Sequence, residues 1–247
     1  MALNNSLVQQ NANKMVEFTA GNETVKLSPN IIRNYLVSGD SGKVTDQEIV
    51  MFLNLCRYQH LNPFLREAYL VKYGNNPATI VTGKDAFMKR AQRNERYKGN
   101  QAGVIIITQA GQLEQRIGGL VLKDKGEELV GGWAKVFIDG FVEPVEVTVS
   151  FDEYVARKSN GEVNSQWRTK PATMIRKVAL VQALREAFPE DFEGMYSQEE
   201  MGVDSELLSD APVRVPDPVA TYTDDERPIE SEEPLPFDGP DIDPLEE

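Results

Sequence analysis

The stretch WRTKPATMIRKVALVQALREAF, residues 167–188, carries a long helical pattern. Its apolar side chains recur every three or four residues, the spacing that places them on one side of an α-helix; they are Met174, Val178, Val181 and Leu184. Proline is favoured in the first turn of a helix, and Pro171 stands where this pattern begins. The pattern predicts an amphipathic helix from about Pro171 to Phe188.

The region before this helix has the pattern of a strand-rich domain. Runs of β-branched and apolar residues separated by glycines predict four strands, at residues 104–108, 113–121, 132–138 and 142–149. A short helix at 151–158 and a polar loop at 159–166 connect the last strand to the long helix. Because short turns join successive strands, we expect a meander-like antiparallel sheet.

The N-terminal half combines short helices with a hairpin. Ser28-Pro29 is a typical helix start, and Thr45-Asp46-Gln47-Glu48 is a capping-box sequence. The signals along this half predict a strand at 23–27, helices at 28–36, 45–60 and 82–94, and paired strands at 68–73 and 78–81. The predicted fold class is therefore α+β, with small antiparallel sheets and hairpins packed with helices.

The charge of the chain is unevenly distributed. From residue 189 to the end there are 20 acidic and 2 basic residues, whereas residues 1–188 carry 24 basic and 19 acidic ones. Three regions are predicted: a partly disordered or oligomer-contacting segment at 1–27, a binding domain at 28–196, and a disordered, acidic, proline-rich tail at 197–247. The basic body suggests nucleic-acid contact. The tail competes with DNA for that body, docks a partner, or serves as a solubilising linker.

The residue types present exclude most kinds of active site. His60 is the single histidine and Cys56 the single cysteine, which excludes histidine-based metal sites, histidine-containing triads, zinc knuckles and internal disulfides. The sequence GDSGKVT at 39–45 has too few residues between its glycines for a phosphate-binding loop, and we interpret it as a helix–helix connection. We expect no cofactor, no metal and no enzymatic activity. Without a long apolar run or a signal-peptide pattern, the expected location is the cytoplasm.

Basic residues concentrate in two segments of the body. The first carries Lys84, Lys89, Arg90, Arg93 and Arg96, and the second carries Arg168, Lys170, Arg176, Lys177 and Arg185. Such cations can neutralise phosphates, and the rings of Trp167 and Trp133 can stack on bases. The alternative is that the basic side chains form only the solvated faces of helices, with Trp167 in the core.

Three motifs occur along about 130 residues of the sequence. They are HLNPFLREAY at 60–69, VTGKDAF at 81–87, and the pattern W-x-x-x-P-x-x-M-x-R-x-x-A-x-x-Q-x-x-R-x-A-F at 167–188. Together they resemble the Red-beta/RecT family of phage single-strand annealing proteins, and within it the lambda Bet branch.

This resemblance implies a protein of phage recombination that anneals complementary DNA strands without ATP. It also implies a fold related to eukaryotic annealing proteins, and rings or helical filaments whose basic groove holds single-stranded DNA and the annealed duplex. The implied partners are further copies of the chain and a phage exonuclease. The acidic tail suggests one further partner, a host single-stranded-DNA-binding protein.

The family motifs carry over to individual positions of this chain. Arg66, Arg176 and Arg185 match basic family positions. The candidate DNA-binding set is Arg66, Lys84, Arg90, Trp167, Arg168, Lys170, Arg176, Lys177 and Arg185. Ala172 and Val178 stand where the lambda branch has lysines, and we hypothesise that the neighbouring Lys170 and Lys177 replace them.

Two other functions are compatible with the sequence. A single-stranded-DNA-binding accessory protein would protect DNA without accelerating strand pairing. A nuclease would need carboxylates that converge in space, and a nuclease inhibitor could use the acidic tail as a DNA mimic.

Overall fold

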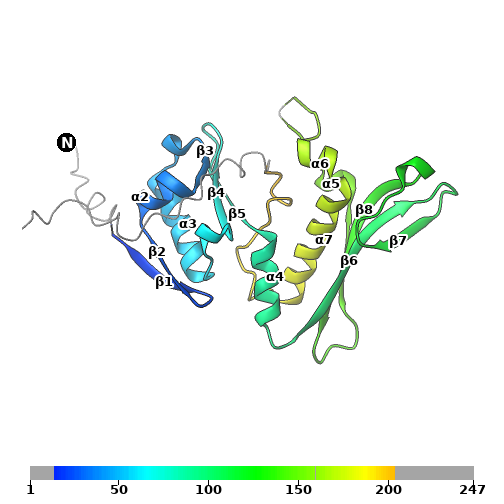
Figure 1. Cartoon of the computed structure of the whole chain (residues 1–247), viewed down its shortest axis with the longest axis horizontal. Coiled ribbons are helices and arrows are strands. Elements are labelled where there is room, and N and C mark those ends of the chain that lie inside the picture. The colour runs from blue at the N-terminus through cyan, green and yellow to red at the C-terminus, as the bar shows by residue number, and fades with distance from the viewer. Residues whose placement is uncertain (1–13, 159, 204–247) are drawn as a thin grey trace, which may run out of the picture. The chain divides into compact units, whose positions relative to one another are not determined.

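The computed structural model of the chain describes residues 14–158 and 160–203 (Figure 1). Over these ranges the chain forms a two-stranded, a three-stranded and a four-stranded sheet, joined and covered by helices. This confirms the predicted α+β class. Most of the acidic tail, residues 204–247, and the first 13 residues lie outside the described part, so the predictions of disorder made for them apply to residues not described.

The described chain begins with a hairpin. Strands β1 (Val16–Ala20) and β2 (Glu23–Leu27) pair in antiparallel register. The Ser28 hydroxyl then accepts a hydrogen bond from the backbone N–H of Ile31 at 3.3 Å and begins helix α2 (Pro29–Ile31). A π-helical turn at Ile32–Leu36 continues α2, so the predicted strand at 23–27 and helix at 28–36 are both present, whereas β1 was not predicted.

The middle sheet contains a strand that the sequence did not reveal. Strand β3 (Val37–Gly39) runs parallel to β4 (Ala68–Lys72), which pairs antiparallel with β5 (Thr79–Thr82). Gly39 has a φ of 86°, and a Cβ atom there would lie 2.3 Å from the Lys72 carbonyl oxygen. The interpretation of residues 39–45 as a plain helix–helix connection is therefore wrong, because the segment begins at the end of a three-residue strand.

Helix α3 (Asp46–Tyr58) carries the predicted capping box. The backbone N–H of Glu48 donates to the Thr45 hydroxyl at 3.3 Å, and the backbone N–H of Thr45 donates to the Glu48 carboxylate at 2.8 Å. The same carboxylate accepts hydrogen bonds from Lys72 and from the backbone of Ala78, each at 2.6 Å. Glu48 therefore ties the start of α3 to the β4–β5 hairpin.

Helix α4 (Lys84–Arg93) leads into the four-stranded antiparallel sheet, whose strand order is β7-β6-β8-β9. The strands are β6 (Tyr97–Ile107), β7 (Leu113–Ile117), β8 (Glu128–Ile138) and β9 (Val145–Ser150). All four strands were predicted, but their bounds differ: β6 begins earlier, and β7 ends at Ile117 because residues 118–127 form a loop.

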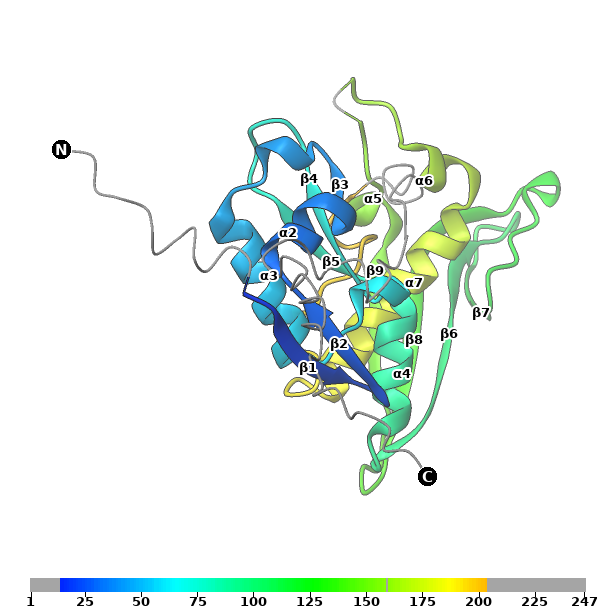
Figure 2. The same ribbon diagram turned by 60° about the vertical axis from the view of Figure 1, so that its left-hand side comes forward.

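Three helices follow the sheet: α5 (Phe151–Tyr154), α6 (Ser165–Thr169) and α7 (Pro171–Ala187). Helix α7 packs against β6, β8 and β9 on one side and against α4, α5 and α6 elsewhere, as Figures 1 and 2 show. It approaches so closely that a Cβ atom at Gly132 would lie 2.6 Å from the Ile175 carbonyl oxygen. The predicted helix is confirmed, but it is not one-sided, since buried residues face both the sheet and the neighbouring helices.

The residues after α7 fold back onto the middle sheet. The backbone N–H of Thr82 donates to the Tyr196 carbonyl oxygen at 2.7 Å, and Val203 packs with Val71 and Val81. Residues 197–203, which the prediction assigned to the tail, are thus partly buried in the described structure. Within the described ranges, no helix is long and apolar enough to cross a membrane.

Candidate nucleic-acid interface

The candidate cations fall into three groups according to the surface pocket that they line. The Arg66 pocket contains Arg66, Lys84 and Lys177, the Lys170 pocket contains Arg168 and Lys170, and the Arg90 pocket contains Arg90. Two candidates lie outside these pockets, namely Arg176 and Arg185. The interface predicted as one set is therefore distributed over separate pockets of one chain.

All three family motifs contribute residues to the Arg66 pocket. Arg66 follows a 3-10 turn (Pro63–Leu65) and has a left-handed backbone, with a φ of 60°, which is uncommon for a residue with a side chain. Gly83 precedes α4, and a Cβ atom there would lie 2.7 Å from the Arg66 carbonyl oxygen. This close contact requires glycine and brings Lys84, the first residue of α4, next to Arg66.

Acidic side chains already neutralise part of the Arg66 pocket. The Lys89 ammonium lies 2.7 Å from the Glu67 carboxylate, and the Lys177 ammonium lies 2.7 Å from Glu199. Neither Arg66 nor Lys84 forms an ion pair with any residue that the structure describes. These two cations are the ones in this pocket that remain available to a phosphate.

The Lys170 pocket lies where α6 meets α7. Arg168 and Lys170 are exposed, and the loop between β7 and β8 contributes Lys123 to the opposite wall. Within residues 14–158 and 160–203, none of these three cations forms an ion pair, and no acidic residue lines the pocket. Such a pocket favours an anion such as a phosphate group.

Three of the candidate arginines form intramolecular contacts. Arg90 donates hydrogen bonds to Gln59 and, at 2.6 Å, to the Asp191 carbonyl oxygen, and burial lowers its pKa. Arg176 donates to the carbonyl oxygen of Ala102 in β6 at 3.1 Å. Arg185 lies 2.5 Å from the Glu200 carboxylate and 4.8 Å from the centre of the Tyr196 ring.

The two tryptophans are not available for base stacking in this structure. Trp167 is 1% exposed and packs edge-on against Phe151, with 5.7 Å between the ring centres. Trp133 is 4% exposed, and its indole N–H donates to the Arg116 carbonyl oxygen at 3.3 Å. The alternative that Trp167 belongs to the core is the one that the structure supports, and we leave Trp167 out of the interface.

The two hypothesised lysine replacements have different surroundings in the structure. Lys170 lines the same pocket as Ala172, so its ammonium group lies near the position where the lambda branch has a lysine. Val178 is fully buried, and the neighbouring Lys177 is paired with Glu199. Lys170 therefore shares a pocket with Ala172, whereas Lys177 has an intramolecular partner and Val178 faces no open surface. The replacement of the family lysines stays a prediction.

Lys123 is a member of the Lys170 pocket that the sequence did not single out. It lies in a loop that the periodicity assigned in part to a strand, 45 residues before Arg168 and 47 before Lys170 in the facing wall. The only local signal was the pair of lysines at 123 and 125, flanking Asp124. The sequence alone does not show that Lys123, and not Lys125, lies beside Arg168 and Lys170.

The described residues do not contain a metal-binding cluster of three or more histidine, cysteine or acidic side chains. Cys56 is fully buried in the core, and burial raises the pKa of its thiol well above the ordinary value. A thiol in this state is a poor nucleophile.

Comparison with known proteins identifies the family. The RecT family model matches residues 22–212, which include all three motifs and both pockets with unpaired cations. An uncharacterized protein of Ureaplasma parvum serovar 3 is 30% identical over 138 residues, which are 56% of this chain and 52% of that protein. The chain therefore spans about half the length of this curated relative. Since the family match covers most of its residues, the chain belongs to the RecT family.

Proposed function

We propose that this protein is an ATP-independent single-strand DNA annealing protein of homologous recombination, of the lambda Bet type within its family. The observation that carries the proposal is the presence, in a RecT family chain, of two pockets with unpaired cations. These cations are Arg66 and Lys84 in one pocket and Arg168, Lys170 and Lys123 in the other. A cation without an acidic partner gains more from a phosphate than one that must first give up an ion pair.

The proposed mechanism divides the work between protein and DNA. Phosphate contacts hold one strand on the protein and reduce its repulsion of the second strand, while the base edges stay free to test Watson–Crick pairing. Because both tryptophans are buried, contact with the strand relies on charge more than on stacking. Binding should consequently tolerate any sequence, and its affinity should fall steeply with salt.

The oligomer and the partners are further parts of the proposal. Neighbouring subunits of a ring or helical filament would join their pockets into one continuous groove for single-stranded DNA and the annealed duplex. A phage exonuclease would supply the single strands, and a host single-stranded-DNA-binding protein would occupy them beforehand. These associations would place the protein in the cytoplasm of a bacterial host.

The proposal is tested by mixing two complementary labelled oligonucleotides without nucleotide and measuring the pairing rate with and without the full chain. Acceleration that is unchanged by ATP supports annealing. Binding without acceleration would instead identify a single-stranded-DNA-binding accessory protein. Shortening of the labelled strands after addition of magnesium would point to a nuclease.

A further inference from the structure

The loop between β7 and β8 forms one wall of the Lys170 pocket. At one end of the loop, a Cβ atom on Gly119 would lie 3.8 Å from the Cβ atom of Ala172, so the loop backbone passes close to the start of α7. Lys123 follows in a 3-10 turn (Lys123–Lys125), is exposed, and lines the pocket together with Arg168 and Lys170. Three cations from two distant parts of the chain thus share a pocket that no acidic residue lines.

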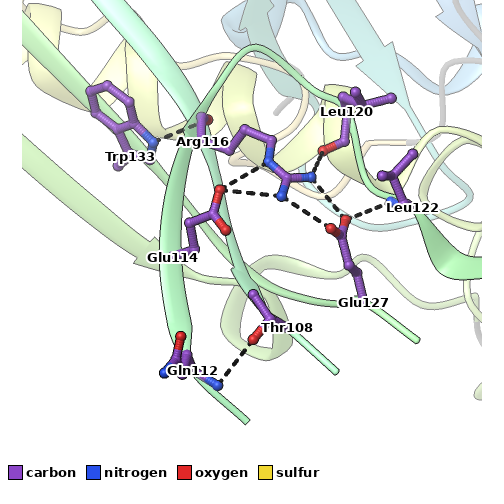
Figure 3. Close-up of polar contacts among 8 residues, drawn as sticks. All are labelled: Thr108, Gln112, Glu114, Arg116, Leu120, Leu122, Glu127 and Trp133. Carbon is purple, nitrogen blue, oxygen red and sulfur yellow. Dashed lines mark hydrogen bonds and ion pairs between the residues drawn. The ribbon is translucent and has the colours of Figure 1, made fainter. Parts of the chain in front are cut away.

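An ion pair links the two ends of this loop. Arg116 in β7 forms a two-pronged contact with the carboxylate of Glu127, with nitrogen–oxygen distances of 2.8 and 3.0 Å (Figure 3). The same carboxylate accepts a hydrogen bond from the backbone N–H of Leu122 at 2.7 Å. The Arg116 guanidinium also donates to the carbonyl oxygen of Leu120 at 3.4 Å. The pair therefore connects the strand, the middle of the loop and the residue at its far end.

The Arg116–Glu127 pair is largely shielded and stays ionised. Its two side chains are 22% and 11% exposed, and hydrogen bonding to Arg116 lowers the pKa of Glu127. Glu114, the second partner of Arg116, lies 3.2 Å away and is 46% exposed, and it contacts no loop residue in Figure 3. A bidentate pair of this kind fixes geometry as well as charge. The loop is thereby ordered before any ligand binds.

We propose that Lys123 is a phosphate-contacting residue of the Lys170 pocket and that Arg116 and Glu127 are its positioning residues. The inference rests on the proposed function, because the phosphate is taken to be that of a DNA strand. Without the ion pair, the loop would have to be ordered at the moment of binding, and the conformational entropy lost then would weaken binding. The pair removes that cost in advance and places Lys123 in the same pocket as Arg168 of α6 and Lys170, which lies between α6 and α7.

The first test compares two lysines of the same 3-10 turn. Lys123 lines the Lys170 pocket, whereas Lys125 lines a different pocket with Thr108 and Gln109. Binding of the full chain to a labelled thymidine oligonucleotide is measured over a range of salt concentrations. Lys123→Gln should reduce the slope of log affinity against log salt by about 0.7, the value for one lost contact on single-stranded DNA. Lys125→Gln should leave the slope unchanged.

The second test separates positioning from charge. Glu127→Gln removes an acid near the pocket, so charge alone would strengthen DNA binding, whereas loss of positioning should weaken it several-fold. Glu114→Gln also removes an acid that contacts Arg116 but leaves the loop tied, and it should not weaken binding. In a Lys123→Gln background, Glu127→Gln should cause little further loss, because the residue it positions is already absent.

Each outcome of these tests decides the inference. Equal effects of Lys123→Gln and Lys125→Gln on the salt slope would overturn the phosphate contact. Additive effects of Glu127→Gln and Lys123→Gln on DNA affinity would overturn the positioning role. In either case the proposed function would still stand. Failure of the unaltered chain to bind the oligonucleotide would overturn the proposed function and, with it, this inference. Melting curves of all variants show whether a loss of affinity merely reflects unfolding.

Discussion

A variant that removes four of the five unpaired cations of the two pockets, leaving Lys123 in place, would test the interface most broadly. It carries four substitutions, Arg66→Gln, Lys84→Gln, Arg168→Gln and Lys170→Gln. None of these side chains forms an ion pair among the residues that the structure describes. Substitutions of such surface residues usually change the free energy of unfolding by no more than about 0.5 kcal/mol each. The variant should therefore fold, and a change in DNA binding can be assigned to the lost charges.

The expected magnitude follows from the number of phosphate contacts. Each contact to single-stranded DNA contributes about 0.7 to the slope of log affinity against log salt, so four lost contacts should reduce the slope by about 2.8. Over a fourfold rise in salt, the loss of affinity should then be about 50-fold smaller for the variant than for the unaltered chain. Fluorescence anisotropy of a labelled thymidine oligonucleotide measures both slopes.

A matched control keeps the net charge of the variant the same. It replaces four other lysines, each of which has an acidic partner 3.1 to 3.7 Å away: Lys26→Gln, Lys43→Gln, Lys98→Gln and Lys135→Gln. If the pockets bind the strand, this control should keep nearly the full salt slope. Equal salt slopes for the two variants with four substitutions each would refute the reasoning, since binding would then depend on total charge and not on the pockets.

Further predictions concern stability and the tail. Burial alone would raise the pKa of Glu48, but hydrogen bonds, first from Lys72, lower it to about 2 from 4.5; because the folded pKa is the lower one, this stabilisation is present above pH 4.5 and lost as the pH falls toward 2. Allowing for solvent screening, the free energy of unfolding measured in urea should fall over this pH range by on the order of 1–2 kcal/mol more in the unaltered chain than in Glu48→Gln. Equal decreases in the two proteins would contradict the ion-pair account. Trp167→Ala should lower the free energy of unfolding by about 3–5 kcal/mol, as for a buried aromatic ring; a loss of DNA affinity without a loss of stability would restore the base-stacking role. Removal of residues 204–247, which are strongly acidic, should raise single-stranded-DNA affinity at low salt if the tail competes for the pockets, and unchanged affinity would exclude competition.

The parts of the fold that the sequence predicted are those determined by local signals. The capping box at Thr45 and the proline at the start of α7 set helix ends through contacts within a few residues. Strand β3 escaped prediction because three residues are too few to show a period, and its parallel pairing with β4 depends on residues more than 30 positions away.

The candidate interface was predicted less completely, because the availability of a cation depends on distant acids. Nothing near Lys177 or Arg185 in the sequence shows that Glu199 and Glu200 return to pair with them. Similarly, Arg90 is occupied by Gln59 and by the backbone of Asp191, which is about 100 residues away. Arg66, Lys84, Arg168 and Lys170 differ from these residues only in having no such partner, and the structure was needed to show it.

The annealing rate of two complementary oligonucleotides without ATP is the measurement that tests the account most directly. It should be made side by side for the unaltered chain, the pocket variant with four substitutions and the control with four substitutions. The account predicts strong acceleration by the unaltered chain and by the control, and little or none by the pocket variant. Acceleration that survives in the pocket variant would contradict the claim that these unpaired cations hold the strand for pairing.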